Sequence, residues 1–125
     1  MHFYLFTLIT SCIIPLVMIL FGYRFKDGGP KKINSFYGYR SVMSMKNMDT
    51  WNFAHRYIGK IWVRNGWIAL SLTLAVMLFM KNSSDDAIGT AGLVLLCVQM
   101  AFLMVPISLT EKALKENFDA SGKRK

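Results

Sequence analysis

Long stretches of apolar residues alternate with short, strongly charged stretches along this chain. One apolar stretch runs from Phe3 to Tyr23 and another from Ala87 to Leu109, and neither contains a charged residue. A helix needs about 20 mostly apolar residues to cross the hydrocarbon layer of a bilayer. Both stretches are therefore predicted to be transmembrane helices, over residues 3–23 and 87–109. The first is expected to be an uncleaved helix, because it lacks the basic segment and the small-x-small cleavage site of a signal peptide.

The middle apolar stretch contains an arginine. Its uncharged part, from Trp67 to Met80, is too short to cross a bilayer, and an extension back to Ile61 gives an adequate length but includes Arg64. An arginine near a helix end can reach the headgroups with its long side chain, so its cost is tolerable. We predict a second span over residues 59–80. This leaves a loop over residues 24–58 and a tail over residues 110–125, in which a short helical extension is followed by a frayed basic end.

The segment before the second span has the periodicity of an amphipathic helix. Asn47 or Asp49 can cap its start. Apolar residues recur at three- and four-residue spacing on one face, and basic residues recur at every fourth position on another. We predict an interfacial helix that lies at the inner membrane surface, leads into the second span and attracts anionic headgroups. Its apolar face comprises Trp51, Ala54, His55, Ile58 and Trp62, and its basic stripe comprises Arg56, Lys60 and Arg64.

The composition agrees with a single all-α integral membrane domain. The chain has 125 residues, which is the usual size of one domain. Apolar residues make up 54% of it and charged residues 18%, which excludes a disordered chain. The net charge of +8 comes from residues that lie beside the apolar spans. Membrane flanks explain this charge more simply than nucleic-acid binding does.

The distribution of basic residues predicts the orientation in the membrane. Nine of the 15 Lys and Arg residues lie between residues 24 and 64, five lie in the tail, and only Lys81 lies between the second and third spans. Segments rich in Lys and Arg remain on the cytoplasmic side. We therefore predict that the N-terminus and the turn around Lys81 are outside, and that the long loop and the C-terminus are inside.

The chain lacks the residue patterns of catalysis and of metal binding. It has only two histidines and no catalytic, zinc-binding or phosphate-binding motif. Cys12 and Cys97 fall within predicted spans and are expected to pack as small apolar residues. No charged residue lies in the middle of a span, which disfavours a channel or transporter, and Gln99 is expected to bond across helices. We predict a protein that is not an enzyme and that has no cofactor or metal site.

Candidate binding residues are concentrated in the loop between the first two spans. Arg40 stands apart from the basic stripe, among the aromatic and small residues of segment 34–41. Its guanidinium can bind a carboxylate or a phosphate, including that of a lipid, in bidentate fashion. It can equally tie the loop to Asp49 or to helix carbonyls, and the sequence does not decide between the two roles. His55 is expected to be a packed, hydrogen-bonded side chain and not a proton sensor.

Eight residues, in order, resemble the signature of the SdpI/YfhL family. The resemblance covers about residues 32–67 by motif and the remainder by the three-span topology. Ser41 and Val42 depart from it, because the family often has Thr and Pro after the arginine. Longer members also carry an additional N-terminal membrane half. The eight residues are Asn34, Gly38, Arg40, Trp51, His55, Gly59, Lys60 and Gly66.

The resemblance implies a protein of the bacterial cytoplasmic membrane without catalytic chemistry. The family takes its name from an immunity protein that guards a bacterium against its own sporulation-delaying toxin. Carried onto this chain, the implied binding residues are Arg40 and Trp51, with support from Asn34, Gly38, His55 and Gly59.

Two functions remain open at this point. In the first, the helix bundle is an immunity protein that binds a membrane-active peptide toxin and keeps it from adopting its active arrangement in the membrane. In the second, it is a membrane-anchored regulatory or scaffold module whose basic inner loop captures a cytoplasmic partner. A homo-oligomer is compatible with both. The sequence names neither the toxin nor the partner.

Overall fold

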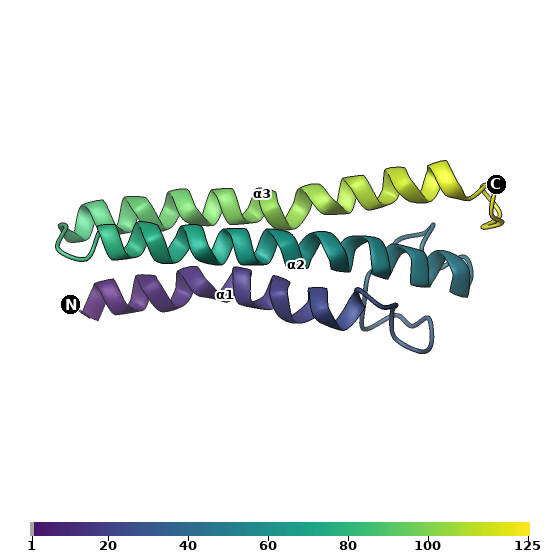
Figure 1. Ribbon diagram of the computed structural model, residues 1–125, viewed down its shortest axis with the longest axis horizontal. Coiled ribbons are helices and arrows are strands. Elements are labelled where there is room, and N and C mark those ends of the chain that lie inside the picture. Colours follow the sequence, from purple (N-terminus) through teal and green to yellow (C-terminus); the bar gives the residue numbers. More distant parts are fainter. Residues whose placement is uncertain (1) are drawn as a thin grey trace.

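The structure, a computed structural model, describes residues 2–125 as three long helices that lie side by side (Figure 1). Helix α1 is His2–Phe25, helix α2 is Met48–Phe79 and helix α3 is Asp85–Asn117. Each helix is long and apolar enough to cross a membrane. The described residues contain no β-sheet. The predicted all-α fold with three membrane-spanning helices is therefore confirmed.

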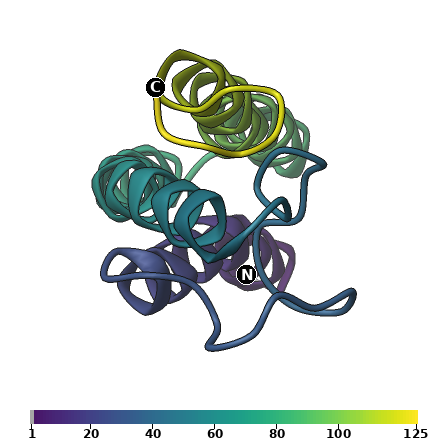
Figure 2. The ribbon, with the colours of Figure 1, turned by 90° about the vertical axis from the view of Figure 1, so that its right-hand side faces the viewer.

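Helix α2 lies between the other two helices along the length of the bundle (Figure 1). The connection over residues 26–47 and the C-terminal residues lie at one end, which we call the loop end. The short connection over residues 80–84 and the start of α1 lie at the other, the turn end. Figure 2, which looks at the loop end, shows that the loop leaves α1, passes along one side of the bundle and approaches α3 before it enters α2.

Glycines allow α1 and α2 to approach closely. A Cβ on Gly59 would lie 2.5 Å from the backbone nitrogen of Lys26, and a Cβ on Gly22 would lie 2.7 Å from the backbone nitrogen of Val63. Gly66, two turns further along α2, is packed against α1 in the same way. Small residues permit such backbone contact between helices in membranes. The structure thus places Gly59, a predicted binding residue, between two helices.

The segment predicted to be an interfacial helix is the beginning of α2. The Oδ1 atom of Asn47 accepts a hydrogen bond from the Thr50 N–H at 2.9 Å, and the Thr50 hydroxyl accepts one from the Asn47 N–H at 3.1 Å. This reciprocal cap confirms the predicted start. From Met48 the helix continues along one axis into the span (Figure 1), and the structure does not show a helix lying along a surface. The reason is that its apolar face, including Ile58, packs against Leu114 of α3.

The tail is ordered, so the prediction of a frayed end is wrong. Helix α3 continues to Asn117, and Phe118 then pairs with Arg124 in an isolated antiparallel bridge. The Arg124 guanidinium lies 5.0 Å from the centre of the Phe118 ring, a cation–π contact. The side-chain amide of Asn47 also donates to the Gly122 carbonyl at 2.7 Å. These contacts join parts of the chain that are distant in sequence, which a local pattern does not reveal.

A proline in the middle of α1 leaves a backbone carbonyl without its helical partner. Pro15 has no N–H, so the carbonyl of Ser11 cannot form its usual bond four residues along. The Nε2 atom of Gln99, from α3, donates to this carbonyl at 2.7 Å and to the Thr73 hydroxyl of α2 at 2.8 Å. Gln99 is only 2% exposed. The expected bond across helices is therefore confirmed, and it joins all three helices at one point.

The proline in α3 is compensated in the same manner. Pro106 leaves the carbonyl of Phe102 without its helical donor. The side-chain amide of Asn65, from α2, donates to that carbonyl at 3.1 Å. Leaving a buried carbonyl unpaired costs about 1–3 kcal/mol in protein mutational data. Each helix-breaking residue is thus matched by an amide on a neighbouring helix.

Replacing Gln99 by leucine is expected to reduce the free energy of unfolding by about 1–2 kcal/mol, because the Ser11 carbonyl loses its donor. The loss should be much smaller in a Pro15→Ala background, where the N–H of the new alanine pairs with that carbonyl. Reversible unfolding of the purified protein in mixed micelles would measure both values.

Pro106→Ala provides the matched control, because it restores the helical N–H donor of the other carbonyl, that of Phe102. The cost of Gln99→Leu should be unchanged in that background. Equal costs of Gln99→Leu in the Pro15→Ala and Pro106→Ala backgrounds would contradict the assigned pairing.

Candidate functional site

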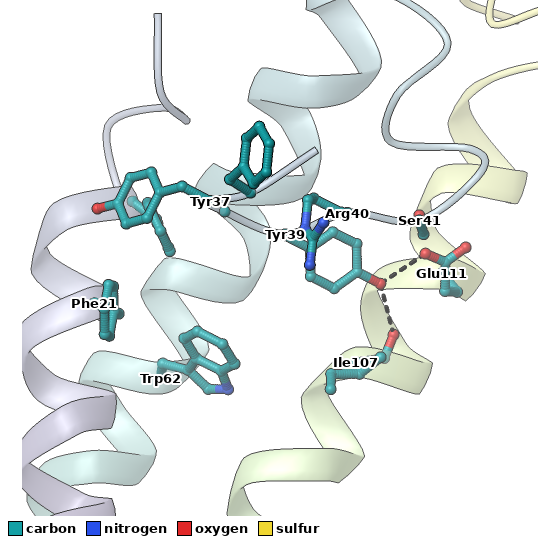
Figure 3. Close-up of a pocket in the computed structure, with 11 residues that line it drawn as sticks. Phe21, Tyr37, Tyr39, Arg40, Ser41, Trp62, Ile107 and Glu111 are labelled. Atoms are coloured by element: carbon teal, nitrogen blue, oxygen red, sulfur yellow. Dashed lines mark hydrogen bonds between the residues drawn. The ribbon is translucent and has the colours of Figure 1, made fainter. Parts of the chain in front are cut away.

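A cavity of about 540 Å³ opens at the loop end of the bundle (Figure 3). Phe21 lines it from α1, Trp62 from α2 and Glu111 from α3, and the loop contributes Tyr37 and Arg40. Most of its wall is aromatic, and two charged side chains border it. Such a site suits an apolar or aromatic group that carries a polar group at one end.

His55, near the start of α2, holds the loop that forms one wall of this cavity. Its side chain is fully buried. Its Nε2 atom accepts a hydrogen bond from the Tyr39 N–H at 2.7 Å, so its Nδ1 atom carries the hydrogen and donates to the Trp51 carbonyl at 2.7 Å. Burial lowers the pKa of His55, and the bond to the Trp51 carbonyl acts in the opposite direction. The imidazole is therefore a neutral connector between the loop and α2.

Two glycines bring the loop backbone onto this imidazole. A Cβ on Gly29 would lie 2.6 Å from the Nδ1 atom of His55, and a Cβ on Gly38 would lie 2.7 Å from its Nε2 atom. Gly38 also has a φ of 110°, which favours glycine. The indole N–H of Trp51 donates to the Pro30 carbonyl at 2.9 Å. Trp51 and His55, both predicted binding residues, are fully buried and anchor the loop.

Tyr39 connects the same loop to α3. Its hydroxyl donates to the Oε1 atom of Glu111 at 2.7 Å and lies 3.3 Å from the Ile107 carbonyl (Figure 3). Burial and then the hydrogen bond to Glu111 raise the pKa of Tyr39, so the hydroxyl keeps its proton. Neither Tyr39 nor Glu111 is among the predicted binding residues. The aromatic run around Gly38 was a signal for Tyr39, whereas nothing in the tail distinguished Glu111 from its charged neighbours.

Arg40 lies at the exposed edge of the cavity. Its guanidinium donates to the Ser35 carbonyl within the loop. Among residues 2–125 it has no other hydrogen-bond partner and no ion pair, so the predicted ties to Asp49 and to helix carbonyls are not formed. A guanidinium has five N–H donors. Most of them remain available to a carboxylate or phosphate at the edge of the cavity.

Asn34 shapes the loop from within. Its Oδ1 atom accepts hydrogen bonds from the Phe36 N–H at 2.9 Å and from the Tyr37 N–H at 2.7 Å, which is an Asx turn. Tyr37 then packs against α1, with its ring centre 6.1 Å from that of Phe21. Phe36 is 93% exposed. Asn34 thus positions two aromatic side chains at the cavity.

The basic stripe belongs to a different surface. Arg56, Lys60 and Arg64 are exposed on α2 and border a second cavity of about 510 Å³, which Leu109 of α3 also lines. Of the predicted binding residues, only Gly38 and Arg40 line the loop-end cavity. Asn34, Trp51 and His55 support the loop beside it, and Gly59 lies between α1 and α2. Residues 2–125 contain no cluster of three His, Cys, Asp or Glu side chains that could hold a metal ion.

Comparison with known proteins places this loop in a family. A family model described as the SdpI/YfhL protein family matches residues 31–110, which include most of the loop, all of α2 and most of α3. The protein described as "Uncharacterized protein YfhL" of Bacillus subtilis (strain 168) is 35% identical over 99 residues. The match covers 79% of this chain and 80% of that relative. No solved structure matches the chain.

Acidification is expected to destabilise the loop end through His55. Its pKa is lowered in the folded state, so the unfolded chain binds a proton more readily below about pH 6.5. The contribution of His55 is therefore complete above that pH and is lost as the pH falls, by at most about 1.4 kcal/mol per pH unit. Unfolding of the purified protein between pH 8 and pH 5 measures this slope.

His55→Gln should flatten the slope, because a glutamine does not titrate and still offers an oxygen to the Tyr39 N–H. His2→Gln, at the exposed start of α1, should retain it. A slope that survives His55→Gln would show that another group is responsible.

Proposed function

Because the chain belongs to the SdpI/YfhL family, we propose that it is an immunity protein that protects a bacterium against a membrane-active peptide toxin. Three helices able to cross a membrane support a resident membrane protein. The protection would come from binding and would involve no catalysis, cofactor or metal.

The proposed orientation places the loop end in the cytoplasm of the bacterial cell. Of the 15 Lys and Arg residues, all but Lys81 lie at the end of α1, in the loop, in the first part of α2 or in the tail over residues 110–125. The positive-inside rule then puts the N-terminus and the turn end outside and the C-terminus inside. The loop-end cavity would open where the cytoplasmic leaflet meets water.

The observation that carries the proposal is the aromatic cavity with Arg40 at its edge. Phe21, Tyr37 and Trp62 offer an apolar wall to a large side chain of an amphipathic peptide. Arg40 has a single hydrogen-bond partner among the described residues, so it can pair with a carboxylate of that peptide. A rigid wall also lowers the entropic cost of binding, and the His55 and Tyr39 contacts supply that rigidity.

Capture at this face suits a peptide that inserts into the bilayer. A peptide that depolarises the cell by spanning the hydrocarbon layer would place one end at the cytoplasmic leaflet. Binding of that end in the cavity would hold the peptide beside the bundle and away from other copies of itself. The protein would then block the assembled, conducting form and leave the peptide chemically intact.

A second candidate function is a membrane-anchored regulatory or scaffold module that captures a cytoplasmic partner. The exposed side chains of Arg56 and Lys60 favour it, because they present positive charge beside the proposed cytoplasmic face. Charge reversal at these two residues would abolish co-purification of such a partner, whereas toxin protection would persist.

Protection is expected to depend on Arg40. A toxin-sensitive bacterium would express the parent chain or Arg40→Ala and would then be exposed to peptides secreted by the source strain. The parent should preserve the membrane potential, and Arg40→Ala should raise the required protein level by about tenfold or more, as for loss of a charge-assisted bond of about 1.5–3 kcal/mol.

Arg24→Ala is the matched control, since it removes an exposed arginine at the end of α1 that lines neither the loop-end cavity nor the groove along α2. Its protection should equal that of the parent at equal protein level. Equal protection by Arg40→Ala would remove Arg40 from the site. Absence of protection by the parent would contradict the immunity function and favour the regulatory or scaffold module.

A further inference from the structure

The second cavity is a groove between α2 and α3, on a surface that the loop-end cavity does not share. Arg56, Lys60 and Arg64 line it together with the apolar side chains of Ile61 and Leu109. Phe53 and Tyr57 complete it at its loop end, and no acidic residue lines it. Positive charge and apolar surface are thus combined in one hollow of about 510 Å³.

None of the three cations of this groove forms an ion pair within the described part of the chain, where the one ion pair joins Lys26 and Asp27. Asp27 and Asp49 border neighbouring hollows that Arg56 also lines, and no carboxylate borders the groove itself. Arg64 makes only long contacts of 3.4 Å with the side-chain oxygen of Asn65. Like charges four residues apart on a helix repel each other. An anion bound in the groove would relieve this repulsion.

The position of Arg64 along α2 makes the need for an anion stronger. Fifteen residues separate it from Phe79 at the end of the helix, which is about 22 Å along the axis. The hydrocarbon layer of a bilayer is about 30 Å thick. A bilayer that ends at Phe79 would therefore reach back to about Lys60 and place Arg64 inside its edge. A phosphate at the headgroup level is the anion available to a side chain at this depth.

We propose that this groove is a binding site for an anionic phospholipid. The phosphate groups bind Arg56, Lys60 and Arg64, and an acyl chain lies along Ile61 and Leu109. Successive cations are four residues, or about 6 Å, apart along the axis, so the row suits a headgroup with two phosphates such as cardiolipin. Basic pockets between membrane helices on the cytoplasmic side bind such headgroups. The proposal depends on the groove alone and not on toxin binding at the loop-end cavity.

The test is a lipid titration of the purified full-length protein in zwitterionic detergent micelles, followed by native mass spectrometry. The parent should bind cardiolipin much more tightly than phosphatidylcholine. The triple variant R56Q/K60Q/R64Q should weaken cardiolipin binding by about 100-fold, at roughly tenfold or less for each basic residue. Inorganic phosphate should not compete at equal concentration, because it lacks the acyl chain.

The control variant K31Q/K32Q/K115Q loses the same charge from exposed positions outside the groove. Retained cardiolipin binding in this control supports the site. Equal weakening in both triple variants, no preference over phosphatidylcholine, or competition by inorganic phosphate would each overturn it. If R56Q/K60Q/R64Q does not fold, Arg64→Gln alone is tested, and it should weaken cardiolipin binding by about tenfold. Unchanged cardiolipin binding by Arg64→Gln would reject the proposal.

Discussion

The whole bundle depends on pairing backbone carbonyls inside an apolar medium. Two prolines release one carbonyl each, from Ser11 and from Phe102, and both are reached by an amide of a different helix. Because water is absent from the hydrocarbon layer, no other donor can satisfy them. These bonds act at defined positions along each helix and therefore set which turns of α1, α2 and α3 meet. Glycines between α1 and α2 then allow the close approach that the register requires.

The register of the helices determines the shape of the loop end. His55 bonds to the loop at a fixed position along the bundle because α2 is packed against α1. Glu111 bonds to the same loop because α3 is packed against α2. The loop is thereby held at both sides, by one imidazole and one carboxylate. The residues shared with the family signature mostly build this support, whereas Arg40 stands at the edge where a ligand can arrive.

Much of this architecture could be predicted from apolar length, periodicity and capping chemistry. The three helices, the cap at Asn47 and the cross-helix role of Gln99 follow from local patterns or from a lone polar residue in an apolar span. The loop-end cavity could not be predicted, because Tyr39 and Glu111 are 72 residues apart and meet only in the folded bundle. The ordered tail was missed for the same reason. The predicted interfacial helix is the beginning of α2 and packs against α3. An amphipathic pattern does not distinguish a bilayer from neighbouring helices as the apolar partner.

The bond between Asn47 and Gly122 has a consequence for the order in which the protein assembles. The two residues are 75 positions apart, and α2 and α3 lie between them. During synthesis the amide of Asn47 must wait until both later helices have entered the bilayer and Gly122 has emerged. The loop end is therefore the last part of the molecule to close. A nascent chain that has inserted only two helices lacks the contacts of the loop with Glu111 and Gly122. Only the finished chain has a closed loop end.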